Sequence, residues 1–144
     1  MQIKTTSQLD EHDLNDIFSI HQTVFGDIEH FKKKLAGKRG LVFTLSISNE
    51  QVIGYKIGYP LSEDRFYSWM GAVSPVARNK GVATSLMIAQ HNWAKTQDYR
   101  VIETKTMNRW RQMLLLNIKH GFDVKAVEVE RDGVEKIILE KRLD

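Results

Sequence analysis

The residues best suited to hold a ligand gather in one short stretch around Gly81. Gly81 and Ala83 carry little side-chain bulk, while Arg78, Lys80 and the hydroxyl of Thr84 supply hydrogen-bond donors. A helix is expected to begin at Gly81, so its first backbone amides have no intrahelical partner and point outward. Because the helix dipole adds positive potential at that end, the stretch predicts a site for a phosphate group.

The stretch matches neither of two common phosphate-binding loops. The spacing Gly-x-x-x-x-Gly-Lys-Ser/Thr is absent, and so is the three-glycine pattern Gly-x-Gly-x-x-Gly. Glycine in front of a helix is common, so these residues alone equally allow a Gly81 that only opens a helix and an Arg78 that is solvated. The order of the surrounding elements decides between the two interpretations.

Hydrophobic spacing and turn residues predict those elements. Strands are expected over residues 1–6, 41–47, 51–59, 66–73, 100–106, 122–130 and 135–143, and helices over 10–25, 28–36, 81–96 and 108–120. The order β α α β β β α β α β β indicates one α/β (α+β) domain over residues 1–144, with a mixed central sheet and helices on both faces. The strands over 66–73 and 100–106 are expected to be parallel, joined by a right-handed crossover.

Single residues predict details of these elements. Asp27 is expected to cap the second helix, Gly121 to end the last one, and Asp132-Gly133 to turn the closing hairpin. The inner face of the last helix is expected to hold Trp110, Met113, Leu114 and Ile118.

Composition narrows the class of protein. The 144 residues include no cysteine, which excludes disulfides, thiolate metal sites and a cysteine nucleophile and fits a cytoplasmic location. No apolar run is long enough to span a membrane, and residues 1–16 lack the pattern of a signal peptide. The histidines, expected mostly on the surface or on helix faces, show no metal-ligand spacing, so no metal is expected; they are His12, His21, His30, His91 and His120.

The net charge of +3 is a mild basic excess that suits a ligand carrying phosphates. The densest basic cluster, Lys32 to Lys34 with Lys38 and Arg39, is expected to be a solvated helix face and turn. A domain that binds nucleic acid usually shows a stronger basic footprint, so no nucleic acid is expected as a partner.

The run Val73-x-Pro75-x-x-Arg78-x-x-Gly81-x-Ala83 resembles the acetyl-CoA-binding motif of the GNAT superfamily, whose core is Gln/Arg-x-x-Gly-x-Gly/Ala. The downstream run from Asn117 to Gly121-Phe122 is similar to the end of the family's last crossover helix. The order of elements also matches across nearly the whole chain. The resemblance implies a GNAT fold and an acetyl-CoA-dependent N-acetyltransferase.

The resemblance also implies where acetyl-CoA, the co-substrate, would lie. The cofactor occupies a cleft where two parallel strands splay apart, and the backbone of the strand Met70 to Val73, which includes Ala72 and Val73, would pair with its pantetheine arm. The Val73 amide would polarise the thioester carbonyl, an oxyanion-type stabilisation. Asn108 would bond the pantetheine from the other side, or would only cap a helix. The pyrophosphate would lie on Arg78, Asn79, Lys80, Gly81, Val82, Ala83 and Thr84.

The implied reaction is direct attack by a neutral primary amine of a small molecule or peptide on the thioester, in a ternary complex. Some relatives use a strand glutamate as base, but residues 66–69 hold no carboxylate. Glu63, Asp64 and Glu103 are the nearest acidic candidates, and a water chain is the alternative. Many relatives place an acidic tyrosine where this chain has Asn117, which can only donate a hydrogen bond to the leaving thiolate.

These departures keep one alternative open, a non-catalytic acyl-CoA-binding protein with a regulatory role. In the family, the acceptor pocket is built by the first two helices and the loop before the motif strand. Here Glu29, Glu63 and Asp64 would attract a cationic amine, and Tyr59, Phe66, Tyr67 and Trp69 would wall the pocket or belong to the core. The closing hairpin, Val124 to Leu143, would pair at the edge of a homodimer.

Overall fold

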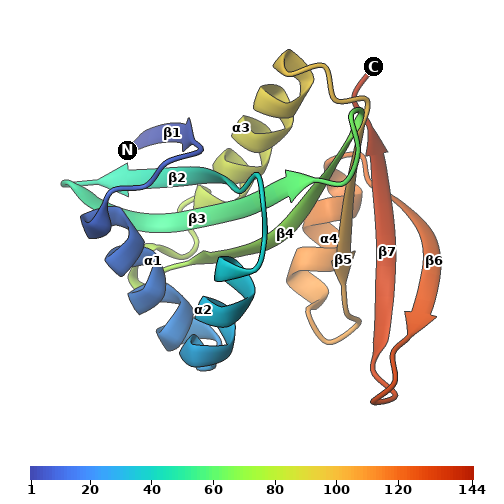
Figure 1. Ribbon diagram of the computed structural model, residues 1–144, viewed down its shortest axis with the longest axis horizontal. Coiled ribbons are helices and arrows are strands. Elements are labelled where there is room, and N and C mark those ends of the chain that lie inside the picture. Colours follow the sequence, from blue (N-terminus) through green and yellow to red (C-terminus); the bar gives the residue numbers. More distant parts are fainter.

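The structure is a computed structural model that describes residues 1–144. Its elements confirm the expected order (Figure 1). They are β1 (Gln2–Thr6), α1 (Glu11–Val24), α2 (Ile28–Ala36), β2 (Val42–Ser48), β3 (Gln51–Pro60), β4 (Arg65–Val73), a 3-10 turn (Pro75–Ala77), α3 (Val82–Thr96), β5 (Val101–Thr106), α4 (Arg111–Lys119), β6 (Asp123–Val129) and β7 (Glu135–Arg142). None of the helices is long and apolar enough to cross a membrane.

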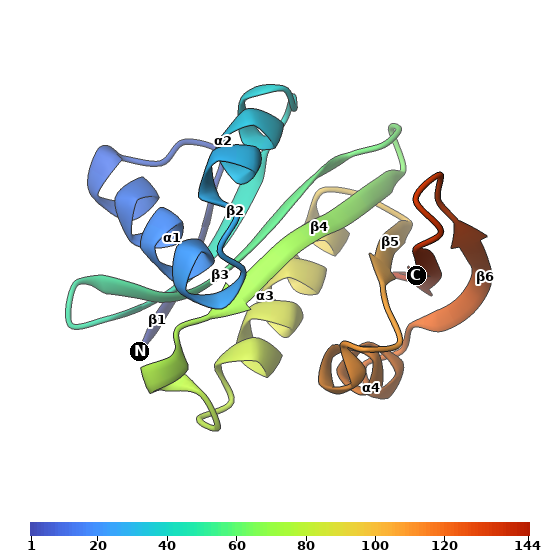
Figure 2. The ribbon, with the colours of Figure 1, turned by 90° about the horizontal axis from the view of Figure 1, so that it is seen from below.

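The seven strands form one mixed sheet in the order β1-β2-β3-β4-β5-β7-β6. Only β4 and β5 are parallel; every other neighbouring pair is antiparallel. Figure 2 shows α1 and α2 on one side of the sheet and α3 and α4 on the other. The predicted α/β architecture, with a mixed sheet covered on both faces, is therefore confirmed.

Two apolar clusters hold the layers together. Ile17 and Phe31 of the first two helices pack on Leu45, Tyr55 and Ile57 of β2 and β3. On the opposite face, a second cluster joins α3 to β4, β5 and β7; its fully buried members are Phe66, Ala94, Ile102 and Leu139. Burial of such side chains is the main favourable term in folding, so these clusters fix the sheet against its helices.

The parallel strands β4 and β5 pair only over their first residues. Their register runs from Arg65 opposite Val101 to Ser68 opposite Thr104 and ends there. At the same point the β3–β4 register shifts and leaves Trp69 without a partner, which makes a bulge in β4. Beyond the bulge β4 follows β3 while β5 follows β7, so the two strands diverge (Figure 1). We call the space between residues 69–73 of β4 and the end of β5 the β4–β5 opening.

The last helix differs from its prediction. It begins at Arg111, not Asn108, and Trp110 occupies its N-cap position without a capping side-chain bond. Its predicted inner face is wrong for Trp110 and Ile118, which are 42% and 48% exposed, whereas Leu114 packs on the core as predicted and Asn117 is buried. Only one side of this short helix meets the sheet, and that side carries Leu114 and Asn117.

Asp27 precedes α2 as expected, but its side chain makes no cap bond. Instead its carboxylate accepts a hydrogen bond of 2.8 Å from Nε2 of His21, whose Nδ1 lies 3.0 Å from the hydroxyl of Tyr55. His21 is buried and stacked on Phe31, so its ring nitrogens need partners inside the fold. Of the two places expected for the histidines, surface or helix face, His21 and His91 occupy buried faces of α1 and α3, and His91 is 5% exposed.

Candidate functional site

The loop between β4 and α3 leaves a row of backbone amides free. Asn79 and Gly81 both have left-handed backbone angles, with φ of 63° and 76°, which turn the chain sharply into α3. The first amide with a partner inside the helix is that of Ser85, which donates to the Gly81 carbonyl at 3.0 Å. The amides of Val82 and Ala83 therefore have no acceptor within the chain, as expected at a helix N-terminus.

The side chains on this loop are also free. Arg78, Asn79 and Lys80 are exposed, and neither cation forms an ion pair within the chain. The structure thus gathers the predicted phosphate-binding residues in one turn: Arg78, Asn79, Lys80, Gly81, Val82, Ala83 and Thr84. An anion at this end would meet both free amides and unpaired positive charge.

The edge of β4 that faces the opening carries further free donors. The Ser74 amide donates to the Ile53 carbonyl of β3 at 2.8 Å. Because backbone groups alternate in direction along an antiparallel pair, Ala72 then also faces β3, while the amides of Gly71 and Val73 face the other way. No β5 residue pairs with this part of β4, so both amides point into the β4–β5 opening. The sequence did not single out Gly71, because only the strand register shows its direction.

Polar side chains line the closed end of the opening. Thr104 donates its hydroxyl proton to the Ser68 carbonyl at 2.8 Å, and this bond links β5 to β4. The hydroxyl of Ser68 donates to Oε1 of Gln90 in α3, also at 2.8 Å. Nε2 of Gln90 is buried without a partner. Such orphaned donors are rare and indicate a place where a ligand or water can bind.

The two predicted asparagine contacts occupy different surroundings. Asn117 is 3% exposed on α4, and its carbonyl accepts the amides of His120 and Phe122. Asn108 is exposed in the turn before α4 and borders a surface groove of about 470 Å³. Because the helix begins three residues later, the alternative that Asn108 caps it is wrong.

The acidic candidates for a general base are not equivalent. Glu63 is exposed in the turn that precedes β4, and eight residues of extended strand, about 26 Å, separate Arg65 from Val73. Glu63 and Asp64 therefore lie at the opposite end of β4 from the free amides. Glu103 lies in β5 next to Tyr67, but it is paired with Nη1 of Arg65 at 3.2 Å.

An aromatic surface lies on the α1/α2 side of the sheet, next to the part of β5 and β7 that no helix covers (Figure 1). Trp69 contacts Tyr59, and the ammonium of Lys38 lies 4.7 Å from the ring centres of both. Burial raises the pKa of Tyr67, and the carboxylates of Glu103, Glu128 and Glu130 raise it further. Phe66, by contrast, is fully buried on the α3 side, so of its two alternatives, pocket wall or core, the core is the correct one.

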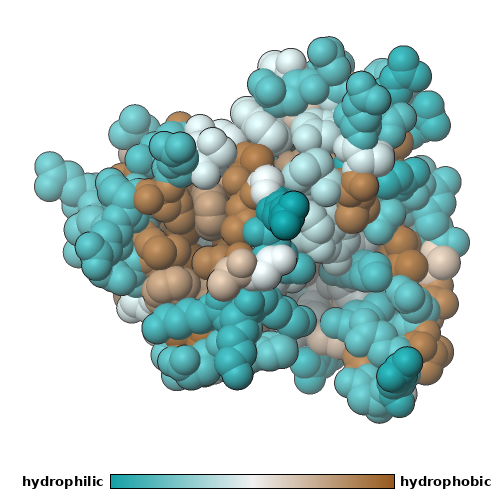
Figure 3. Space-filling view, in the orientation of Figure 1, coloured by the Kyte–Doolittle hydropathy of each residue, from teal (hydrophilic) through white to brown (hydrophobic).

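A second aromatic pair borders the same side. Phe25 at the end of α1 meets Trp110 edge-on, with 6.1 Å between ring centres, although the two are far apart in sequence. Both are partly exposed, at 37% and 42%. Figure 3 shows that this face is hollowed between α2 and the β6–β7 hairpin.

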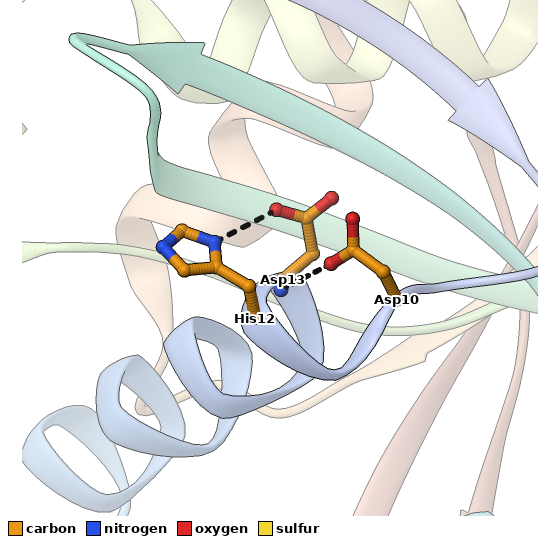
Figure 4. Close-up of side chains that lie close together, drawn as sticks. All are labelled: Asp10, His12 and Asp13. Atoms are coloured by element: carbon orange, nitrogen blue, oxygen red, sulfur yellow. Dashed lines mark hydrogen bonds and ion pairs between the residues drawn. The ribbon is translucent and has the colours of Figure 1, made fainter.

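Asp10, His12 and Asp13 at the start of α1 lie close enough together to hold a metal ion (Figure 4). Other contacts within the chain explain why these side chains lie close together. Asp10 is the N-cap residue and accepts the Asp13 amide at 2.8 Å, while Asp13 lies 3.5 Å from Nδ1 of His12 and 3.2 Å from Nζ of Lys4. With a lysine already on the buried carboxylate, this group carries no metal assignment.

Comparison with known proteins gives one family and many similar folds. The sequence model of the acetyltransferase (GNAT) family matches residues 9–114, which is most of the chain. A search of curated protein sequences gave no match.

Three solved structures illustrate the similarity of fold. An aminoglycoside 6'-acetyltransferase type Ii has a TM-score of 0.86 at 12% identity, covering 100% of this chain and 98% of that one. The ribosomal-protein-S18-alanine N-acetyltransferase from Escherichia coli has a TM-score of 0.81 at 15% identity, with coverage of 99% and 95%. A GNAT family acetyltransferase from Elizabethkingia anophelis, solved with acetyl-CoA bound, has a TM-score of 0.79 at 18% identity and 97% coverage of both chains. At these identities the likeness concerns the fold alone.

Proposed function

Since the chain belongs to the GNAT acetyltransferase family, we propose that it transfers an acetyl group from acetyl-CoA to a primary amine of a small molecule or peptide. The observation that carries the proposal is the β4–β5 opening. Free amides of Gly71 and Val73 line one of its edges, and the unpaired amides of α3 lie where β4 ends. A long ligand with an amide-bearing arm and a pyrophosphate fits this arrangement.

In the proposed complex, the pyrophosphate of acetyl-CoA accepts hydrogen bonds from the loop and the first turn of α3. Arg78 and Lys80 add positive charge there. The pantetheine arm extends along β4 beside Ala72 and Val73, as an added strand would. The Val73 amide polarises the thioester carbonyl, and the Gly71 amide is a second donor along the same edge. Asn108 and Asn117 supply contacts from the β5–α4 side.

The chemical step is attack by the neutral amine on the carbonyl carbon. An alkylamine is mostly protonated at neutral pH, so a base or a water chain must take its proton. Glu103 is the better placed carboxylate, although its ion pair with Arg65 favours a role through water. Glu63 is too distant from Val73 to serve directly. Asn117 donates a hydrogen bond to the departing sulfur.

The acceptor is proposed to bind on the α1/α2 side, against the aromatic surface of Tyr59, Tyr67 and Trp69. The names of two similar structures, an aminoglycoside and a ribosomal-protein alanine N-acetyltransferase, support an amine as acceptor. The absence of cysteine fits work in a reducing cytoplasm.

The second candidate function is acyl-CoA binding without turnover. Asn117 stands where many family members carry the acidic tyrosine, and no unpaired carboxylate lies on the opening, which favours this alternative. The two functions differ in whether CoA is released when an amine is present.

We further propose that β6 forms the edge of a homodimer. Three valines of β6, Val124, Val127 and Val129, are exposed at 53–65%, and Leu115 and Ile118 of α4 are exposed as well. The right margin of Figure 3 shows apolar side chains on this side. Light scattering tests the proposal, and a monomeric mass at micromolar concentration would contradict it.

The enzymatic proposal is tested with a panel of amines, acetyl-CoA and a thiol reagent. The protein contains no cysteine, so every thiol detected is released CoA. Aminoglycosides, polyamines, amino acids and peptide N-termini cover the main acceptor classes. Amine-dependent release supports catalysis, whereas tight acetyl-CoA binding with no release for any class supports the non-catalytic alternative.

A further inference from the structure

Lys56 of β3 extends its side chain toward the β4–β5 opening. Its neighbour in the β3–β4 ladder is Gly71, and a Cβ atom on that glycine would lie 3.2 Å from Cγ of Lys56. The lysine stem therefore lies over the bare backbone of Gly71. It does so on the α3 side of the sheet, because a Cβ on Gly54, two residues earlier, would meet Val82 of α3. Gly71 has no β5 partner, so the aliphatic part of the Lys56 side chain lies beside β4 at the edge of the opening.

The groups that face Lys56 from the surrounding elements include no carboxylate. His91 of α3 is buried, and its Nδ1 accepts a hydrogen bond of 3.0 Å from Nζ of Lys141 in β7. His120 follows α4. Burial lowers the pKa of His91 to about 3, and the charges of Lys141, Lys56 and His120 contribute to this. His91 is thus neutral at physiological pH, and its Nε2 is a buried donor without a partner, like Nε2 of Gln90.

The unpaired lysine and the buried donors around it favour binding of an anion that accepts hydrogen bonds. Lys56 forms no ion pair within the chain, and burial lowers the pKa of its ammonium to about 8. A partly buried charge without a counter-ion is unfavourable, and buried donors without acceptors are costly. An anion beside Gly71 would supply the counter-ion that Lys56 lacks within the chain.

We propose that Lys56 is a catalytic residue that faces the sulfur of coenzyme A and protonates it as the thioester bond breaks. This inference rests on the proposed function, because it needs the thioester to lie beside Gly71. The pantetheine arm runs along the same edge of β4, so its sulfur is the atom that develops negative charge nearest the lysine.

The step balances without another reactant. The amine nitrogen bonds to the carbonyl carbon, the carbon–sulfur bond breaks, and its electron pair goes to sulfur. A proton passes from Nζ of Lys56 to that sulfur, which leaves neutral lysine, free CoA thiol and the acetylated amine. The proton lost by the amine goes to the base or to water, and Lys56 is protonated again from solvent.

The neighbouring groups are less suited to this role. His91 carries no proton to release at neutral pH, since its pKa is about 3. Lys141 is engaged with His91, and an amide such as Asn117 can stabilise a thiolate but not protonate it. The pKa of the Lys56 ammonium, about 8, is close to the pKa of a thiol. Closely matched pKa values favour efficient proton transfer.

The test measures the ionisation of the thiol of bound CoA by its ultraviolet thiolate absorbance, which needs no acceptor. The variants are Lys56→Met and Lys56→Arg, with Lys95→Met, an exposed lysine of α3, as the matched control. At pH 7.5 we expect wild type, Lys56→Arg and the control to hold about tenfold more thiolate than Lys56→Met, because a nearby cation favours the charged form. This ratio tests whether the cation faces the sulfur. The proton transfer itself is tested by CoA release with an active amine, in which Lys56→Arg should be about tenfold slower than wild type because arginine keeps the charge but releases no proton. Circular dichroism confirms that each variant is folded.

A second readout separates this inference from the proposed function. Desulfo-CoA, which lacks the sulfur, should bind wild type and Lys56→Met equally. If wild type binds no CoA at all, the proposed function fails and this inference with it. If CoA binds but its thiol ionises equally with and without Lys56, only the role of Lys56 is overturned. If Lys56→Met weakens desulfo-CoA as much as CoA, Lys56 supports the site generally and the inference is wrong.

Discussion

Thr104 and Ser68 form the last pair between β4 and β5, and the Thr104 hydroxyl donates to the Ser68 carbonyl at 2.8 Å. This side-chain bond satisfies a backbone carbonyl at the point where the two parallel strands part. The opening therefore begins at a closed hydrogen bond rather than at a frayed edge, and its position along β4 is fixed.

Replacing Thr104 by Val keeps the side-chain shape and removes that donor. We expect a loss of about 1–3 kcal/mol in the free energy of unfolding, because the buried Ser68 carbonyl is left without this donor. Urea unfolding measures the change. Thr96→Val, at an exposed helix end, is the control, and equal effects for the two variants would contradict the account.

Gly58→Ala should destabilise the fold by about 3 kcal/mol. The new Cβ would lie 2.4 Å from the Phe66 ring and 2.7 Å from the Tyr67 carbonyl, so a buried ring and the bulged strand would both have to shift. Gly37→Ala is the matched control, since its Cβ would lie at ordinary contact distance and its φ is −86°. Thermal and chemical unfolding should separate the two variants clearly.

The pair of His21 and Asp27 predicts a pH dependence of stability. The hydrogen bond from His21 lowers the pKa of Asp27 below its ordinary value of 3.8. A depressed folded-state pKa contributes stability that is present above pH 4 and is lost as pH falls through the folded value. The stability gap between wild type and Asp27→Ala should therefore be widest above pH 4 and narrow between pH 4 and 2. A gap in melting temperature that stays constant over this range would disprove the linkage.

Glu63 and Glu103 should behave differently in turnover. Glu63→Gln is expected to leave kcat/KM for any active amine within about twofold, because the residue lies about 26 Å from Val73 along β4. Glu103→Gln should lower kcat/KM severalfold, because it removes the carboxylate nearest the opening. Steady-state kinetics of the two variants distinguish them, and a large loss in Glu63→Gln would contradict the placement of the reaction at Val73.

Local signals in the sequence were sufficient for the fold. The hairpin residues Asn49 and Glu50 adopt the left-handed angles that a tight turn requires, and Gly121 ends α4 with a φ of 98°. The position of the β4–α3 loop was also predictable, because glycine before an apolar-periodic segment marks the start of a helix. Each of these features depends on residues close together in the chain.

The interior of the site was not predictable in the same way. Gly71 faces the opening only because of the bulge at Trp69, and the approach of Lys56 to Gly71 depends on the β3–β4 register. Glu63 looked close to the motif because it precedes the same strand, but an extended strand carries its two ends apart. The face of α4 was misjudged because polar Asn117 is buried while apolar Ile118 is exposed.

Binding of acetyl-CoA to the β4–α3 loop is the central claim, and a calorimetric titration tests it most directly. The wild type is compared with Arg78→Ala/Gly81→Glu and with Gly133→Glu, whose glycine has a similar φ of 83° and equally open surroundings in the β6–β7 turn. We predict that wild type and Gly133→Glu bind alike, and that the loop variant binds at least about tenfold more weakly through lost charge-assisted hydrogen bonds. Equal binding by all three proteins, or no binding by the wild type, would contradict the account.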